Sequence, residues 1–142
     1  MSFDLLGDLN WLAVIVAAIA YFALGALWYM PKPMAQAWTK SMGWDPSTEE
    51  QQPGAAIYVA PLVTCLLSAI TLAMLAEATG STTVGEGLAL GIVVAIGIAA
   101  AIVLVTGWFG PKKPQPMVFA AITAGYHVVG LVVTAVIVSA WT

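Results

Sequence analysis

Hydrophobic residues are gathered in four long continuous runs, a pattern unlike the alternation of barrel strands. The runs are Trp11–Met30, Ala55–Ala76, Gly87–Phe109 and Met117–Trp141. Each has about 20 residues or more, and a helix of that length crosses a hydrocarbon core about 30 Å thick. Inside a bilayer the backbone must satisfy its own hydrogen bonds, which continuous apolar segments do as helices. The pattern therefore predicts an all-α membrane protein with a single domain, residues 1–142, built as a bundle of four transmembrane helices.

Composition supports this class. The chain is 61% hydrophobic and 8% charged, whereas about a quarter of the residues in soluble domains are charged. The first run resembles a secretory signal in length, but Met1–Asn10 contains Asp4 and Asp8 and no basic residue. We therefore expect the first run to be retained as a membrane span.

The lysines predict an orientation. The chain has four lysines and no arginine: Lys32 and Lys40 follow the first run, and Lys112 and Lys113 follow the third. Basic residues are retained in cytoplasmic loops. We expect a multi-pass protein of the cell (inner) membrane with both lysine segments inside and both the N- and C-termini extracytoplasmic.

The inner loop from residue 31 to 54 is the longest segment between spans. Met34, Ala37, Trp38 and Met42 recur at helical spacing and Gly43 follows them, which predicts a short helix lying at the membrane interface. The rest of the loop, residues 45–54, is polar and turn-like, and its pattern assigns it no role.

Two similar segments end the first and third spans. Trp28–Pro33 and Trp108–Pro114 share a Trp, an aromatic residue, a Pro and a Lys. They indicate either two parallel-repeat hairpins or convergence, because an aromatic belt, a helix-stopping Pro and an inner Lys are all expected at such an end.

A family resemblance rests on the end of the first span. The residues Gly25, Trp28, Tyr29 and Pro31, followed by Trp38, resemble the Gly-x-x-Trp-Tyr-x-Pro signature of the bacterial domain-of-unknown-function 1761 family. The Gly-Tyr pair at 125–126 also resembles the family's last helix, although the Phe-Gly pair often found after the Pro is missing here. The resemblance implies a small four-span membrane fold and no particular activity.

His127 is the one ionisable residue deep in a span, about 15 Å past Met117 along the helix. Ionisable groups at such depth usually face a bundle interior or a wet cavity. With it we group a candidate polar belt at mid-depth, whose members are Tyr21, Thr64, Ser68, Thr123, His127 and Thr134. The belt serves either as a proton relay or substrate contact, or only as hydrogen-bonded packing between helices.

Small residues predict close helix packing. Gly87, Gly91 and Ala95 recur at every fourth position of the third span, and Gly25 and Gly125 lie in the first and fourth. Such faces let another helix approach closely, either within the chain or in a second copy.

Two functions stay open. The first is a small transporter or channel working as a homo-oligomer in the lipid bilayer. The second is a structural or accessory subunit packed against a larger membrane-protein partner. Because one buried His lacks catalytic companions, we expect no enzyme and no catalytic residue, and also no cofactor, metal site or nucleic-acid partner. The lone Cys65 is expected to be an apolar filler.

Overall fold

The computed structural model describes residues 2–30, 32–45, 54–110 and 112–141, and these residues form helices and turns without a strand. The elements in chain order are a 3₁₀ helix η1 (Phe3–Gly7), α1 (Trp11–Tyr29), α2 (Lys32–Met42), α3 (Ala56–Thr79), α4 (Val84–Val94), a π-helical segment η3 (Ala95–Ala100), α5 (Ala101–Trp108) and α6 (Pro116–Ala140).

Four helices are long and apolar enough to cross a membrane: Trp11–Tyr29, Ala56–Thr79, Val84–Trp108 and Pro116–Ala140. The third is made of α4, η3 and α5 joined end to end. The expected spans fall on these helices, so the all-α four-helix membrane fold is confirmed.

The helix ends follow from local residues. Asn10 accepts a hydrogen bond from the backbone N–H of Ala13 and so caps α1. α3 ends at Gly80, whose φ of 67° suits a residue without a Cβ. Thr83 and Glu86 then form a reciprocal capping box at the start of α4, so this carboxylate belongs to the first turn of the helix.

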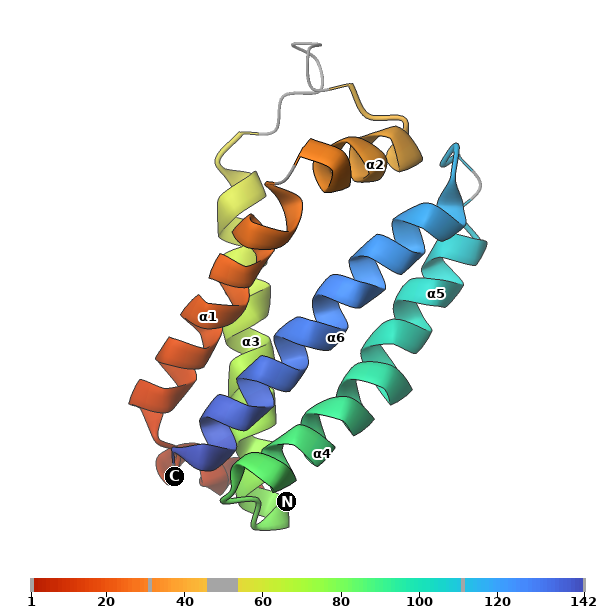
Figure 1. Ribbon diagram of the computed structural model, residues 1–142. Coiled ribbons are helices and arrows are strands. Elements are labelled where there is room, and N and C mark those ends of the chain that lie inside the picture. Colours follow the sequence, from red (N-terminus) through yellow and green to blue (C-terminus); the bar gives the residue numbers. More distant parts are fainter. Residues whose placement is uncertain (1, 31, 46–53, 111, 142) are drawn as a thin grey trace.

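Helix α6 is the centre of the bundle. It packs against α1 and α3 on one side and against α4, η3 and α5 on the other (Figure 1). The third span makes little contact with α3 and depends on α6, and only 17% of its most apolar window is buried, compared with 39% for α6. The hairpin of α1 and α3 and the hairpin of the third span and α6 run in the same direction. Their second helices differ, because α6 packs against every other span whereas α3 makes little contact with the third span, so the two hairpins do not pack alike.

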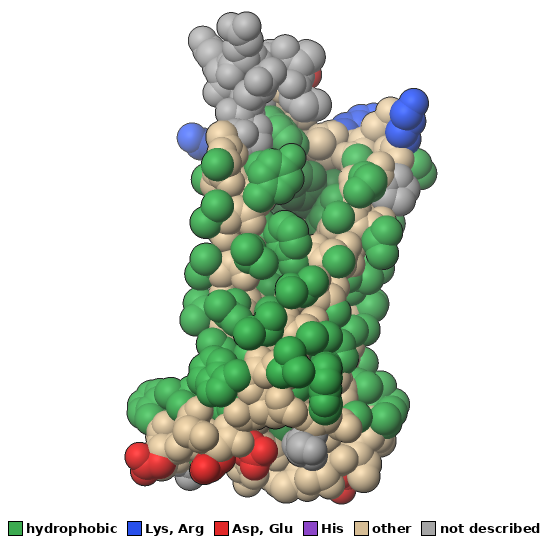
Figure 2. Space-filling model, turned by 90° about the vertical axis from the view of Figure 1, so that its left-hand side faces the viewer, with side chains coloured by type: hydrophobic (Ala, Val, Ile, Leu, Met, Phe, Trp, Pro, Cys, Tyr) green, Lys and Arg blue, Asp and Glu red, His purple; other side chains and the backbone are tan. Residues whose placement is uncertain are grey.

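The lysines lie at one end of the protein, and most of the described acidic residues lie at the other. Lysines appear at the end that carries α2, the larger groups of acidic side chains appear at the opposite end, and hydrophobic side chains cover the length between them (Figure 2). Asp45, which follows α2, is an acidic residue at the lysine end. Both termini lie at the acidic end (Figure 1).

The expected short helix in the first loop is α2. It lies across the lysine-bearing ends of α1 and α6 (Figure 1). The carbonyl of Ser41 accepts a hydrogen bond from the N–H of Gln115, just before α6, at 3.1 Å. Gly43, in the left-handed conformation, lies against the ring of Pro114. These contacts fix α2 to the beginning of α6. Pro31 and the polar segment 46–53 lie outside the described residues.

Candidate functional site: an aromatic cluster between helices α1, α2 and α6

The hydrogen bond of His127 joins α6 to α1. Its Nδ1 lies 2.6 Å from the hydroxyl oxygen of Tyr21. Tyr21 is buried and His127 is half-buried. When the neutral ring carries its proton on Nε2, Nδ1 accepts the phenolic proton. The structure thus pairs His127 with another member of the predicted belt, Tyr21 of the first span.

Tyr126, the neighbour of His127, bonds to the same turn of α1. Its hydroxyl donates to the carbonyl of Tyr21 at 3.4 Å and lies 3.7 Å from Sγ of Cys65. Because the single phenolic proton goes to the carbonyl, the thiol is the donor in the second contact. A Cβ on Gly25 would lie 3.2 Å from this hydroxyl. The absence of a side chain at Gly25 thus lets Tyr126 reach the backbone of α1.

Trp28 makes the reciprocal contact from α1 to α6. Its Nε1 donates to the carbonyl of Ile122 at 3.2 Å. A Cβ on Gly125 would lie 3.1 Å from the indole ring. In each direction, an aromatic residue of one helix lies over a glycine of the other and bonds to a carbonyl about one turn away. Gly25 and Gly125 were expected at packing contacts, and what they accommodate is an aromatic ring.

Trp38 of helix α2 and Tyr29 of α1 complete this group of aromatic residues. The ring centroid of Trp38 lies 5.1 Å from that of Tyr29, which in turn lies 5.5 Å from that of Tyr126. Nε1 of Trp38 donates to the hydroxyl of Thr123 at 3.4 Å. Tyr21, Tyr29, Trp38, Tyr126 and His127 together form what we call the aromatic cluster, which reaches from mid-span to the lysine end.

The structure does not assemble the predicted polar belt as a whole. Thr64 is exposed, and its hydroxyl donates to the carbonyl of Pro61 in its own helix, so its inclusion was wrong. Thr134 is fully buried but also bonds within its helix, to the carbonyl of Gly130. Ser68 is half-buried on α3, and among the described residues it has no hydrogen bond to the cluster. Thr123 joins the site through α2 rather than through a span.

Sequence reasoning missed Tyr126 as a member of the aromatic cluster and Cys65 as a residue that contacts it. Tyr126 was quoted only as part of a Gly-Tyr pair, and Cys65 was read as filler. The signal for Tyr126 was the resemblance itself, because the stretch ending in Trp28-Tyr29 and the Gly125-Tyr126 pair contact each other. Neither segment alone shows that the two pack against each other. No sequence signal pointed to Cys65.

The small-residue face of the third span is used within the chain. A Cβ on Gly87 would lie 2.8 Å from the carbonyl oxygen of Ala135, and one on Gly91 would lie 2.7 Å from Cα of Val132. Ala95 is completely buried. The backbones of α4 and α6 therefore touch along this face, and it is not free to contact a second copy.

Comparison with protein families finds a match over most of the chain. The sequence model of the family described as "Protein of unknown function (DUF1761)" covers residues 12–139. Comparison with curated proteins finds no match, and comparison with solved structures finds none either.

Proposed function

The chain thus belongs to the DUF1761 family of proteins of unknown function, and from the geometry of its site we propose that it is a membrane transport protein in which the Tyr21–His127 pair exchanges protons. The observation that carries the proposal is the 2.6 Å contact between the Tyr21 hydroxyl and Nδ1 of His127, midway along two membrane-spanning helices. Ionisable residues at such depth are costly and rare, and they often mark ion or proton pathways.

The chemistry of the pair suits proton exchange. An imidazole takes up and releases protons near physiological pH. Its Nδ1 is held by Tyr21, while Nε2 has no hydrogen-bond partner within the described part of the chain. In the other neutral tautomer the ring carries its proton on Nδ1 and donates it to the Tyr21 oxygen. This half-buried ring can then accept a proton at Nε2 without losing its bond to α1.

The arrangement of helices supports a homo-oligomer. Within one chain the core around α6 is filled by side chains, and the two hollows described at its surface are not lined by His127. The third span leaves most of its apolar surface uncovered. Copies that pack through this surface would form a homo-oligomer in the lipid bilayer and cover it.

The test is proton flux into liposomes that contain the purified protein and a pH-sensitive dye. We expect flux from the wild-type protein that varies with pH near neutrality. His127→Gln should lower it at least about tenfold while the fold, followed by circular dichroism, is retained. Tyr58→Phe, at an exposed tyrosine of α3, is the matched control. Wild-type liposomes without flux, or His127→Gln with full flux, would overturn the proposal.

The same uncovered surface of the third span also suits an accessory subunit. In that case a larger membrane protein covers it, and His127 serves only as packing. A native mass of the nanodisc-embedded protein separates the two: a multimer of the chain favours transport, and a monomer without flux favours the accessory role.

A further inference from the structure

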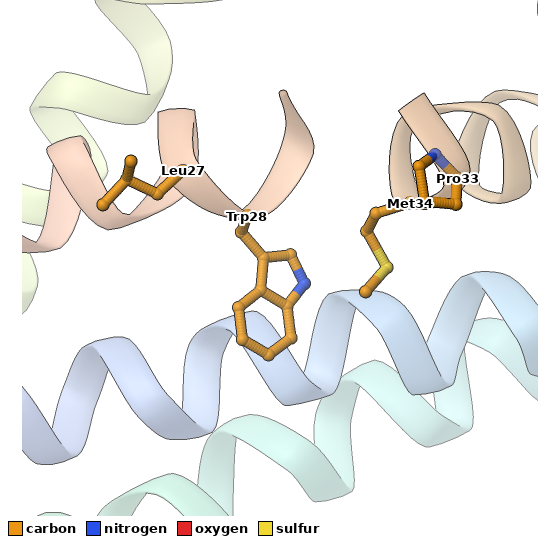
Figure 3. Close-up of a pocket in the computed structure, with 4 residues that line it drawn as sticks. All are labelled: Leu27, Trp28, Pro33 and Met34. Atoms are coloured by element: carbon orange, nitrogen blue, oxygen red, sulfur yellow. The ribbon is translucent and has the colours of Figure 1, made fainter. Parts of the chain in front are cut away.

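A groove opens where α1 ends and α2 begins. It has a volume of about 380 Å³ and is lined by Leu27, Trp28, Pro33 and Met34. The indole ring of Trp28 and the side chain of Met34 extend from the two helices toward α6 and form facing walls (Figure 3). We propose that this groove holds an acyl chain of an anionic phospholipid whose phosphate is bound by Lys32.

The walls of the groove suit hydrocarbon. All four lining side chains are apolar except for one atom, Nε1 of Trp28, and that atom already donates to the carbonyl of Ile122. A polar solute placed between these walls would lose hydrogen bonds to water without replacement. An acyl chain loses none.

The charge beside the groove suits a phosphate. Lys32 is exposed and directly precedes Pro33, one of the lining residues. The acidic residues Asp4, Asp8, Glu77 and Glu86 are close to the opposite ends of the spans, and Asp45, at the lysine end, follows the end of α2 that is far from Lys32. A basic residue near the membrane surface attracts anionic lipid headgroups.

The position of the groove matches the geometry of a lipid. It lies at the last turn of the first span, which ends at Tyr29, so its walls are at the depth where headgroups give way to hydrocarbon. A phospholipid at this place can keep its phosphate at Lys32 while its first methylene groups enter the groove. The bilayer itself supplies this ligand, which separates the proposal from the function of His127.

The charge half of the proposal is tested by native mass spectrometry. The protein is reconstituted in nanodiscs of dioleoylphosphatidylglycerol and dioleoylphosphatidylcholine in equal amounts, released, and its retained lipids are counted. Wild-type protein should retain phosphatidylglycerol in preference. Lys32→Gln should lower this preference about fivefold, the contribution of one lysine near a membrane surface. The matched control is Lys40→Gln at the other end of the same helix, which should keep it.

The apolar half is tested with Leu27→Trp, which fills the groove from an exposed position, and with Leu62→Trp as its control on α3. Leu27→Trp should lose the retained lipid while its thermal unfolding stays close to that of the control, and glycerol phosphate without acyl chains should not displace the lipid. Equal retention of both lipids by the wild type, equal losses in Lys32→Gln and Lys40→Gln, or unchanged retention in Leu27→Trp would each overturn the proposal.

Discussion

The ring of Tyr21 lies directly against the backbone of Gly130, in the space that a Cβ at this position would occupy. Gly130 follows His127 by about one turn of α6. The tyrosine that bonds to the histidine is therefore also seated in a gap that only glycine leaves. The hydrogen bond and the helix packing depend on each other at this point.

Gly130→Ala should be strongly destabilising, because the added methyl group overlaps the Tyr21 ring and a buried ring has little room to move. We expect a loss of about 1–3 kcal/mol, as for other overpacked cores, measured as a lower midpoint of thermal unfolding in detergent. Gly97→Ala is the matched control, since nothing lies within 4 Å of its added Cβ. Equal midpoints for the two variants would contradict this packing.

Gly91→Leu should separate α4 from α6, because its side chain would meet Cα of Val132 and the methyl group of Ala135. We expect a loss of stability of at least about 2 kcal/mol, with the native mass of the protein unchanged because both helices belong to one chain. Gly85→Leu, at an open position of the same helix, is the control. A stable Gly91→Leu protein would mean that the third span does not pack closely.

The sequence predicted the spans well because continuous apolar runs report on the bilayer and not on neighbouring helices. It placed the short helix α2 for a similar local reason, the spacing of Met34, Trp38 and Met42. It also placed Tyr21 and His127, which contact each other, in one belt at mid-depth.

The sequence could not predict how faces pair. Small residues at every fourth position of the third span predict that another helix packs closely against it, and only the fold shows that this helix is α6. Thr64 shared the depth of the belt but lies on the exposed side of α3, and depth does not determine the direction of a side chain. The aromatic cluster joins residues about 100 positions apart, as Tyr21 and Tyr126 are, for which a single sequence carries no pairing signal.

The orientation in the membrane is a separate prediction from the lysines. Alkaline phosphatase folds to an active enzyme only outside the cytoplasm, so fusions at Ser81 and Thr142 should be active and a fusion at Gln51 should be inactive. The physical reason is the retention of Lys32, Lys40 and the third-span lysines on the inner side. An inactive fusion at Thr142 together with an active one at Gln51 would reverse the topology.

The contact between Tyr21 and His127 should appear as a coupling energy. Tyr21→Phe removes the hydroxyl and His127→Leu removes the acceptor, so each single variant loses the hydrogen bond. Once it is lost, the second substitution should cost less than it does alone. We expect a coupling of about 0.6 kcal/mol, and at most about 1.7 kcal/mol, as measured for other hydrogen bonds between membrane helices. Chemical unfolding in mixed micelles of the four proteins of the cycle gives this value.

Tyr21→Phe combined with Thr106→Val is the control pair. Thr106 is exposed on α5 and bonds to Ile102 of its own span, so the effects of these two changes on the free energy of unfolding should add. Additive behaviour of Tyr21→Phe and His127→Leu as well would mean that the two residues are neighbours without an energetically significant bond, and the proton-exchange role of the pair would lose its structural basis.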